Sequence, residues 1–162
     1  MNPNDDRANQ PARNSILIVD DTVANLLAFS AILKKPDCRI VVAASGREAL
    51  ERTLEEDFSL ILMDVRMPEM NGFETAEAIR KRPRTRETPI LFLSAFEAPP
   101  LHLLSKFVGG KTGFLSSPVD ADTLLLKVAP FLKPSVGDGN APSDPNLQKA
   151  SSGSGLGEAS GT

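Results

Sequence analysis

Short apolar runs alternate with segments of helical periodicity five times along the middle of the chain. Each run is four to six residues long, is rich in Ile, Leu and Val, and predicts a buried strand. The predicted strands are residues 15–19, 38–42, 58–63, 90–93 and 112–116. Predicted helices follow them at residues 22–33, from residue 45, from residue 71, at residues 100–108 and at residues 120–132.

The spacing of apolar residues also predicts which side of each helix faces the core. Ser45 and Glu48 form a capping-box pattern that predicts the start of the second helix. Asn71 and Gly72 start the third helix, and Gly109 and Gly110 end a short, weak fourth one. The predicted core-facing residues are Val23, Leu26, Leu27 and Leu33; Ala49, Leu50, Thr53 and Leu54; Phe73, Ala76 and Ile79; and Ala121, Leu124, Leu125, Val128 and Leu132.

Alternating strands and helices indicate an α/β fold. Continuously apolar strands are typical of a parallel sheet that is covered on both faces. Right-handed crossovers then favour a doubly wound arrangement. We expect a flavodoxin-like, five-stranded parallel sheet of order 2-1-3-4-5 with five helices. The topological switch point of this fold lies between the first and third strands.

The two ends of the chain have a different composition from its middle. Residues 1–14 are polar and predict a flexible lead. Residues 134–162 are rich in Gly, Ser, Pro, Asp and Ala, and they contain too few large apolar residues to offset the entropy of ordering. We therefore expect one domain over residues 15–133, followed by a disordered tail or linker.

Composition limits the cellular compartment and the classes of binding partner that we expect. The chain has 162 residues, one cysteine and a formal net charge of −3. The charge gives no reason to expect direct binding to nucleic acid. A single cysteine, Cys38, suits a reducing compartment. No apolar run approaches the ~20 residues that span a bilayer, and the N-terminus lacks an apolar signal segment. We expect a cytoplasmic protein without membrane contact.

Acidic side chains end two strands that meet at the switch point. Asp20 and Asp21 follow the first strand, and Asp64 follows the third. Ligands bind at the carboxyl ends of strands in open α/β sheets, so we expect a Mg²⁺ site there. Asp21 and Asp64 are the expected direct ligands, and Asp20 is expected to act through water. The backbone carbonyl of Arg66 could add a further oxygen.

A carboxylate beside Mg²⁺ can attack a phosphoryl donor in line and form an acyl phosphate. Asp64 is the candidate nucleophile. Ser94 ends the fourth strand, where its hydroxyl can donate to a phosphoryl oxygen. The small side chain of Ala95, next to it, leaves room for the ligand.

Four motifs resemble the receiver domain of two-component response regulators. They occur in order over about residues 15–133 and read ILIVDD at residues 16–21, LMDVRMPEMNG at 62–72, PILFLSA at 89–95 and FLSSP at 114–118. Each motif alone is weak, and the set is specific.

The resemblance implies a role for each motif. Asp64 would accept a phosphoryl group from a histidine kinase or a histidine phosphotransfer protein, while Asp20 and Asp21 hold Mg²⁺. Ser94 would be the switch hydroxyl and Phe114 the switch aromatic residue. The face made by residues 100–108, 112–116 and 120–132 would then change and be read by a downstream protein. Whether that face also forms a homodimer is left open.

One position departs from the family pattern. Ser117 stands where the family has a lysine just before the proline of the fifth strand. Lys111 lies at the other end of that strand and cannot replace it. We hypothesise that Arg66 partly supplies the missing charge, because a guanidinium suits phosphate geometry. Arg66 and Phe96 are also bulky enough to shield an acyl phosphate from water.

The favoured function is a phosphoryl-accepting receiver that catalyses its own modification and is not otherwise an enzyme. Two other functions are possible alternatives. A pseudo-receiver would act by protein binding without phosphorylation, and Ser117 favours it. A phosphohydrolase is less favoured, because it needs an acid–base Asp where this chain has Arg66. His102 is interpreted as a surface or packing residue, and the basic run from Arg80 to Arg86 as a solvated helix end.

Overall fold

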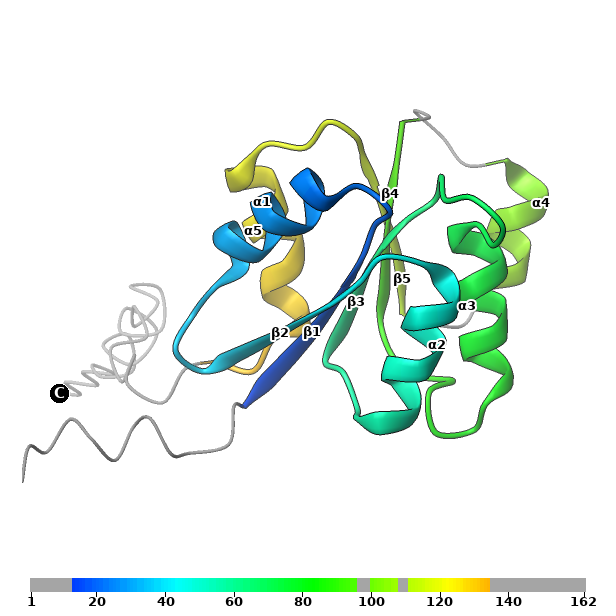
Figure 1. Cartoon of the computed structure of the whole chain (residues 1–162), viewed down its shortest axis with the longest axis horizontal. Helices are drawn as coiled ribbons and strands as arrows, with labels where there is room; N and C mark the ends of the chain where they lie inside the picture. Colours follow the sequence, from blue (N-terminus) through cyan, green and yellow to red (C-terminus); the bar gives the residue numbers. More distant parts are fainter. Residues whose placement is uncertain (1–12, 96–99, 108–110, 135–162) are drawn as a thin grey trace, which may run out of the picture.

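Five parallel strands form the centre of the molecule (Figure 1). The computed structural model describes residues 13–95, 100–107 and 111–134. The sheet order is β2-β1-β3-β4-β5, which confirms the predicted flavodoxin-like arrangement. The strands are β1 (Asn14–Val19), β2 (Cys38–Ala43), β3 (Leu60–Asp64), β4 (Ile90–Ser94) and β5 (Thr112–Ser116).

Helices cover both faces of this sheet. One face carries α1 (Val23–Leu33) and α5 (Ala121–Val128), and the other carries α2 (Gly46–Glu55) and α3 (Gly72–Lys81) (Figure 1). The fourth helix, α4 (Leu101–Leu104), is a single turn and continues into a 3₁₀ turn, Ser105–Phe107. It is short, as the sequence predicts.

Alternate residues of the strands point into two apolar layers. On β1, Leu17 and Val19 pack in the layer under α2 and α3. Ile16 and Ile18 pack in the layer under α1 and α5. All four side chains are fully buried. Burial on both faces explains why residues 16–19 of this strand are all apolar rather than alternating with polar residues.

Some predicted core residues are exposed instead. Val23 and Leu27 are 66% and 68% exposed, because α1 turns Leu26 and Leu33 toward the sheet. Helix α1 is apolar on nearly every side, so periodicity alone does not select its buried face. Leu54 is 60% exposed, because α2 buries Ala49 and Thr53 instead. Ala121, at the start of α5, is also exposed.

Several element boundaries also differ from the prediction. Asn14 belongs to β1 and not to the lead, and β3 begins at Leu60 and includes Asp64. Helix α5 ends at Val128, and a 3₁₀ turn with Pro130 follows, because proline has no N–H for a helical hydrogen bond. Residues 1–12 of the predicted lead and residues 135–162 of the predicted tail lie outside the described residues.

Hydrogen bonds hold the two ends of the described domain together. The Asn14 Nδ2 donates to the carbonyl of Lys133 at 3.0 Å, and the Lys133 N–H donates to Asn14 Oδ1 at 2.8 Å. Arg13 donates to the carbonyl of Pro134 at 3.2 Å. The start of β1 and the segment after α5 therefore lie side by side (Figure 1).

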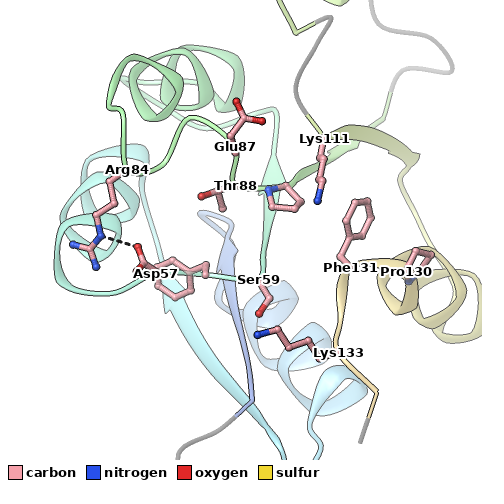
Figure 2. A pocket seen from close by; sticks show the side chains of 11 residues that line it. Asp57, Ser59, Arg84, Glu87, Thr88, Lys111, Pro130, Phe131 and Lys133 are labelled. Carbon is pink, nitrogen blue, oxygen red and sulfur yellow. Dashed lines mark hydrogen bonds and ion pairs between the residues drawn. The ribbon is translucent and has the colours of Figure 1, made fainter.

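A hollow of about 630 Å³ lies at the amino ends of the central strands (Figure 2). Lys111 lines it, and its carbonyl accepts the N–H of Ile90 at the start of β4. This position confirms that Lys111 is at the end of β5 away from Ser116. Arg84 also lines the hollow and pairs with Asp57 at 2.7 Å.

The sequence suggested that the basic run from Arg80 to Arg86 is a solvated helix end, but two of its arginines, at the end of α3 and just after it, bond to the protein. Arg80 is half-buried and donates to the carbonyls of Arg86, Thr88 and Lys111. Arg82 donates to the carbonyl of Leu50 on α2 at 3.0 Å. These hydrogen bonds hold the loop between α3 and β4 against α2 and against the residue before β5. In the described part of the chain, no helix has the length and apolarity to cross a membrane.

Candidate functional site

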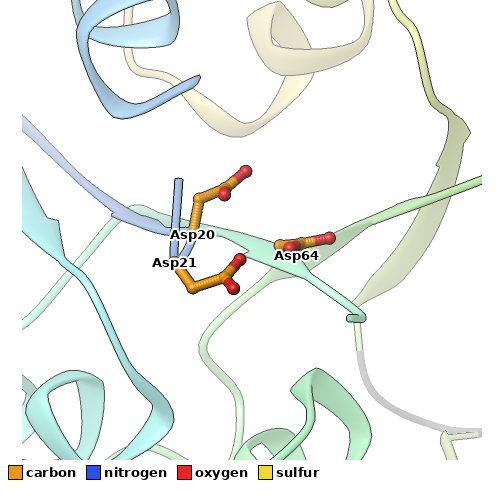
Figure 3. Close-up of side chains that lie close together, drawn as sticks. All are labelled: Asp20, Asp21 and Asp64. Carbon is orange, nitrogen blue, oxygen red and sulfur yellow. The ribbon is translucent and has the colours of Figure 1, made fainter. Parts of the chain in front are cut away.

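Three carboxylates converge where the sheet order reverses (Figure 3). Asp20 and Asp21 follow β1, and Asp64 ends the adjacent strand β3. One oxygen of each lies within 4.8 Å of the others. Asp20 is buried, Asp64 is partly buried and Asp21 is exposed. The three acids predicted from sequence therefore share one site.

Two protein donors fix the carboxylate of Asp20. The Thr22 N–H donates to Oδ1 at 2.8 Å, and the Asn25 Nδ2 donates to Oδ2 at 3.0 Å. Asp20 is only 2% exposed, so these bonds replace water that burial has removed. Asn25 is not among the site residues predicted from the sequence. Its signal was an amide in the first turn of an otherwise apolar helix, five residues after Asp20.

The environment of Asp64 opposes its negative charge. Burial and the nearby charge of Asp20 raise the pKa of Asp64 from 3.8 to about 6. The Arg66 N–H, which donates to Asp64 Oδ1 at 3.3 Å, lowers the pKa of Asp64 and opposes this rise in part. The charge of Asp21 adds a smaller upward contribution. The cluster carries electrostatic repulsion that a cation would relieve.

The loop after Asp64 closes tightly against it. A Cβ added to Gly72 would lie 2.2 Å from the carbonyl oxygen of Asp64, so only glycine fits there. The Gly72 N–H donates to the carbonyl of Val65 at 3.0 Å. Asn71 and Glu74 form a reciprocal capping box at the start of α3. Helix α3 therefore begins directly against the backbone that carries Asp64.

The sequence predicted a capping box at the start of α2, and it did not identify the one at α3. At α2, the Ser45 side chain accepts the N–H of Glu48, as predicted. The Glu48 carboxylate, however, accepts the N–H of Ala44 at 2.8 Å rather than that of Ser45. The reciprocal half of the box is therefore shifted by one residue, from Ser45 to Ala44.

The donor set suits a hard divalent cation. Carboxylate oxygens are the ligands that Mg²⁺ prefers, and it binds through one or two of them together with waters. Asp21 and Asp64 present the more accessible oxygens, whereas both oxygens of Asp20 already accept hydrogen bonds. This difference fits direct binding by the first two acids and a water-mediated role for Asp20.

Ser94 and Ser117 meet at the ends of β4 and β5. Ser94 is 6% exposed, and its carbonyl accepts the N–H of Ser117 at 2.7 Å. Ser117 itself is exposed. Next to Ser94, the backbone of Ala95 leaves the strand at an exposed position. Asp64 and Ser94 thus end the adjacent strands β3 and β4, and Ser117 directly follows β5.

The ring of Phe114 is partly buried against the sheet. It stacks on Phe92 with ring centroids 5.3 Å apart. Phe92 in turn contacts Phe73 on α3 and Phe107 after α4. This aromatic cluster connects β5 to the α4 region. The other bulky residue proposed from sequence, Phe96, lies outside the described residues, and Arg66 is exposed.

Comparison with known proteins identifies the same family as the motifs. The family model described as "Response regulator receiver domain" matches residues 16–129. The signal transduction histidine-protein kinase BarA of Shigella flexneri is 32% identical over 124 residues, which are 72% of this chain and 13% of BarA. The chain thus spans about an eighth of that relative.

Solved structures agree with the sequence matches. The chemotaxis protein CheY4 of Vibrio cholerae is 36% identical with a TM-score of 0.67, covering 75% of this chain and all of CheY4. The receiver domain of the sensor histidine kinase PA1611 of Pseudomonas aeruginosa is 25% identical with a TM-score of 0.64, covering 74% and 98%. Its structure holds a magnesium ion in the active site cleft.

Proposed function

The chain belongs to the response regulator receiver family, and we propose that Asp64 accepts a phosphoryl group within a two-component phosphorelay. The observation that carries this proposal is the convergence of Asp20, Asp21 and Asp64 within 4.8 Å at the switch point of the sheet. The donor would be a histidine kinase or a histidine phosphotransfer protein. The relatives include both a kinase and a chemotaxis regulator, which fits this placement.

Asp64 performs the bond-forming step. Its ionised carboxylate oxygen attacks the phosphorus atom, the bond from phosphorus to the donor breaks, and an acyl phosphate forms on Asp64. The bonding electrons leave with the donor imidazole or, for acetyl phosphate, with acetate. A pKa near 6 leaves the carboxylate mostly ionised at neutral pH. The chain thus promotes its own modification and is not a turnover enzyme.

Mg²⁺ is the proposed cofactor, as in the solved PA1611 receiver. When bound, it neutralises charge on the cluster and on the incoming phosphoryl group. Asp21 and Asp64 would hold it directly, Asp20 through water, and the Arg66 carbonyl would complete the protein ligands. The shared repulsion among the three acids supports this assignment.

The phosphoryl group would be sensed at the ends of β4 and β5. The Ser94 hydroxyl would donate to it, beside small Ala95, and Phe114 would follow the movement of β4. The aromatic contacts of Phe114 lead toward α4, which supports a readout at the α4-β5-α5 face. A downstream protein would bind this face.

Three residues, Ser117, Arg66 and Phe96, would set the lifetime of the acyl phosphate. Ser117 supplies a hydroxyl where the family has a lysine, so the phosphorylated state lacks one positive charge. Arg66, two residues after Asp64, would partly replace that charge. Arg66 and Phe96 together would shield the acyl phosphate, and slow hydrolysis is expected.

The second candidate function is a pseudo-receiver that binds proteins without phosphorylation. Ser117 is the observation that favours it. The clustered acids favour the first function, because a pure binding module gains nothing from three mutually repelling carboxylates. For the setting, we propose a cytoplasmic domain that contacts neither nucleic acid nor membrane.

Intact mass after incubation with Mg²⁺ and acetyl phosphate tests the first function. Wild type should gain one phosphoryl group, and Asp64→Asn should gain none. Glu51→Gln, an exposed carboxyl on α2, is the control for charge loss and should behave as wild type. If wild type takes no phosphoryl group and binds no Mg²⁺, the pseudo-receiver becomes the better assignment.

A further inference from the structure

Asn25 is a polar side chain that the proposed phosphoryl chemistry does not use. It lies in the first turn of α1, a helix that has no charged residue from Val23 to Leu33. Its side-chain amide reaches back to Asp20 Oδ2 at 3.0 Å. The helix as a whole is apolar on nearly every side, so this amide is not explained by solvation of a polar face.

The bond joins an exposed residue to a buried one. Asn25 is exposed, whereas Asp20 is 2% exposed. The other oxygen of Asp20 accepts the Thr22 N–H at 2.8 Å. That second bond comes from the backbone and survives any side-chain substitution at Thr22. Among the described residues, Asn25 is thus the side chain that donates to Oδ2 of this buried carboxylate.

We propose that Asn25 is a positioning residue for the divalent cation site, acting by fixing the orientation of Asp20. This inference rests on the proposed function and adds a member to its site. Donors that orient a metal-binding carboxylate raise metal affinity, because the carboxylate loses less rotational freedom on binding. Asn25 would not contact the cation itself; it keeps Asp20 aimed at the shared site with Asp21 and Asp64.

The test compares Asn25→Leu with wild type. Leucine has nearly the shape of asparagine, lacks the donor and is the better helix former. A purely structural role predicts lower stability in EDTA with unchanged Mg²⁺ affinity. A positioning role predicts that Mg²⁺ affinity, measured by calorimetry on the folded protein, falls roughly tenfold.

Three further variants isolate the mechanism. Asn25→Gln keeps the amide and should recover part of the lost Mg²⁺ affinity. Leu27→Ala lies on the same helix at an exposed position and should leave the affinity unchanged. In an Asp20→Ala background, Asn25→Leu should have no further effect, because the carboxylate that it orients is gone.

Kinetics give an independent readout. With acetyl phosphate as donor, Asn25→Leu should raise the Mg²⁺ concentration for half-maximal phosphorylation and leave the maximal rate unchanged. Equal Mg²⁺ affinity in wild type and Asn25→Leu would overturn this inference alone. An equal loss in the Asp20→Ala background would also overturn it. Absence of Mg²⁺ binding by wild type would overturn both the inference and the metal site on which it rests.

Discussion

Replacing Asp64 by asparagine should stabilise the metal-free protein, and by an amount that depends on pH. Asparagine keeps the shape of the side chain and removes the charge that burial and Asp20 disfavour. A carboxyl whose folded-state pKa is raised contributes stability that is fully present below its unfolded pKa. That contribution is lost as the pH rises through the folded-state pKa.

The relevant pH window follows from the two pKa values. The pKa of Asp64 is raised from 3.8 to about 6, so wild type should lose stability relative to Asp64→Asn between these limits. The full difference corresponds to about 3 kcal/mol, which is an upper bound. Because Asp64 is only half-buried, solvent screening reduces the expected effect to about 1–2 kcal/mol.

Urea unfolding in EDTA at pH 4 and pH 7.5 measures the effect. The two proteins should be nearly equally stable at pH 4, and Asp64→Asn should be more stable at pH 7.5. Titrations that both proteins share cancel in the difference. Glu51→Gln controls for the loss of one negative charge. A difference between wild type and Asp64→Asn that is the same at both pH values would refute the reasoning.

Three other substitutions test separate parts of the structure. Arg66→Ala should shorten the half-life of the phosphorylated protein and weaken binding of beryllofluoride, and unchanged values of both would exclude a role for the guanidinium. Gly72→Ala should destabilise the fold by about 1–3 kcal/mol in urea unfolding, because its Cβ would overlap the Asp64 carbonyl, and an unchanged midpoint would contradict that contact. Asn14→Ala should cost about 1–3 kcal/mol by removing both bonds to Lys133, whereas no loss would mean that water replaces them.

The sheet could be predicted because its signal is carried by whole segments. Five apolar runs at regular spacing leave few alternatives to a parallel, doubly wound sheet, and the order β2-β1-β3-β4-β5 is as expected. The positions of Asp20, Asp21 and Asp64 follow directly, because strand ends of a parallel sheet lie at one edge. The convergence of these acids was thus a consequence of topology.

Helix orientation was harder to predict, because α1 is apolar on nearly every side. Val23 and Leu27 satisfy the helical spacing as well as Leu26 and Leu33 do, yet only the latter pair is buried. Which pair faces the sheet is decided by how the helix packs, and periodicity does not contain that information. The same holds for Leu54 at the end of α2.

Contacts that depend on side-chain direction could not be predicted from the sequence either. Asn25 donates to Asp20 from the first turn of α1, and its position as an amide in an apolar helix does not reveal which group accepts its hydrogen bond. Gly72 could be predicted as a turn residue, but its close approach to the Asp64 carbonyl depends on the path of the whole loop. Local patterns located these residues without showing what they touch.

The hydrogen bonds between Asn14 and Lys133 have a consequence for how this domain can be joined to others. Both ends of the described fold leave from one corner, at the amino edge of the sheet. The six residues of β1 separate that corner from Asp20 by about 20 Å. A domain joined to the chain before residue 13 or after residue 134 would be connected at this one corner. The acidic edge would stay open to a docking phosphoryl donor. Such a domain would respond to phosphorylation through a conformational change within the fold, because it is attached at the end of β1 that lies away from the acidic edge.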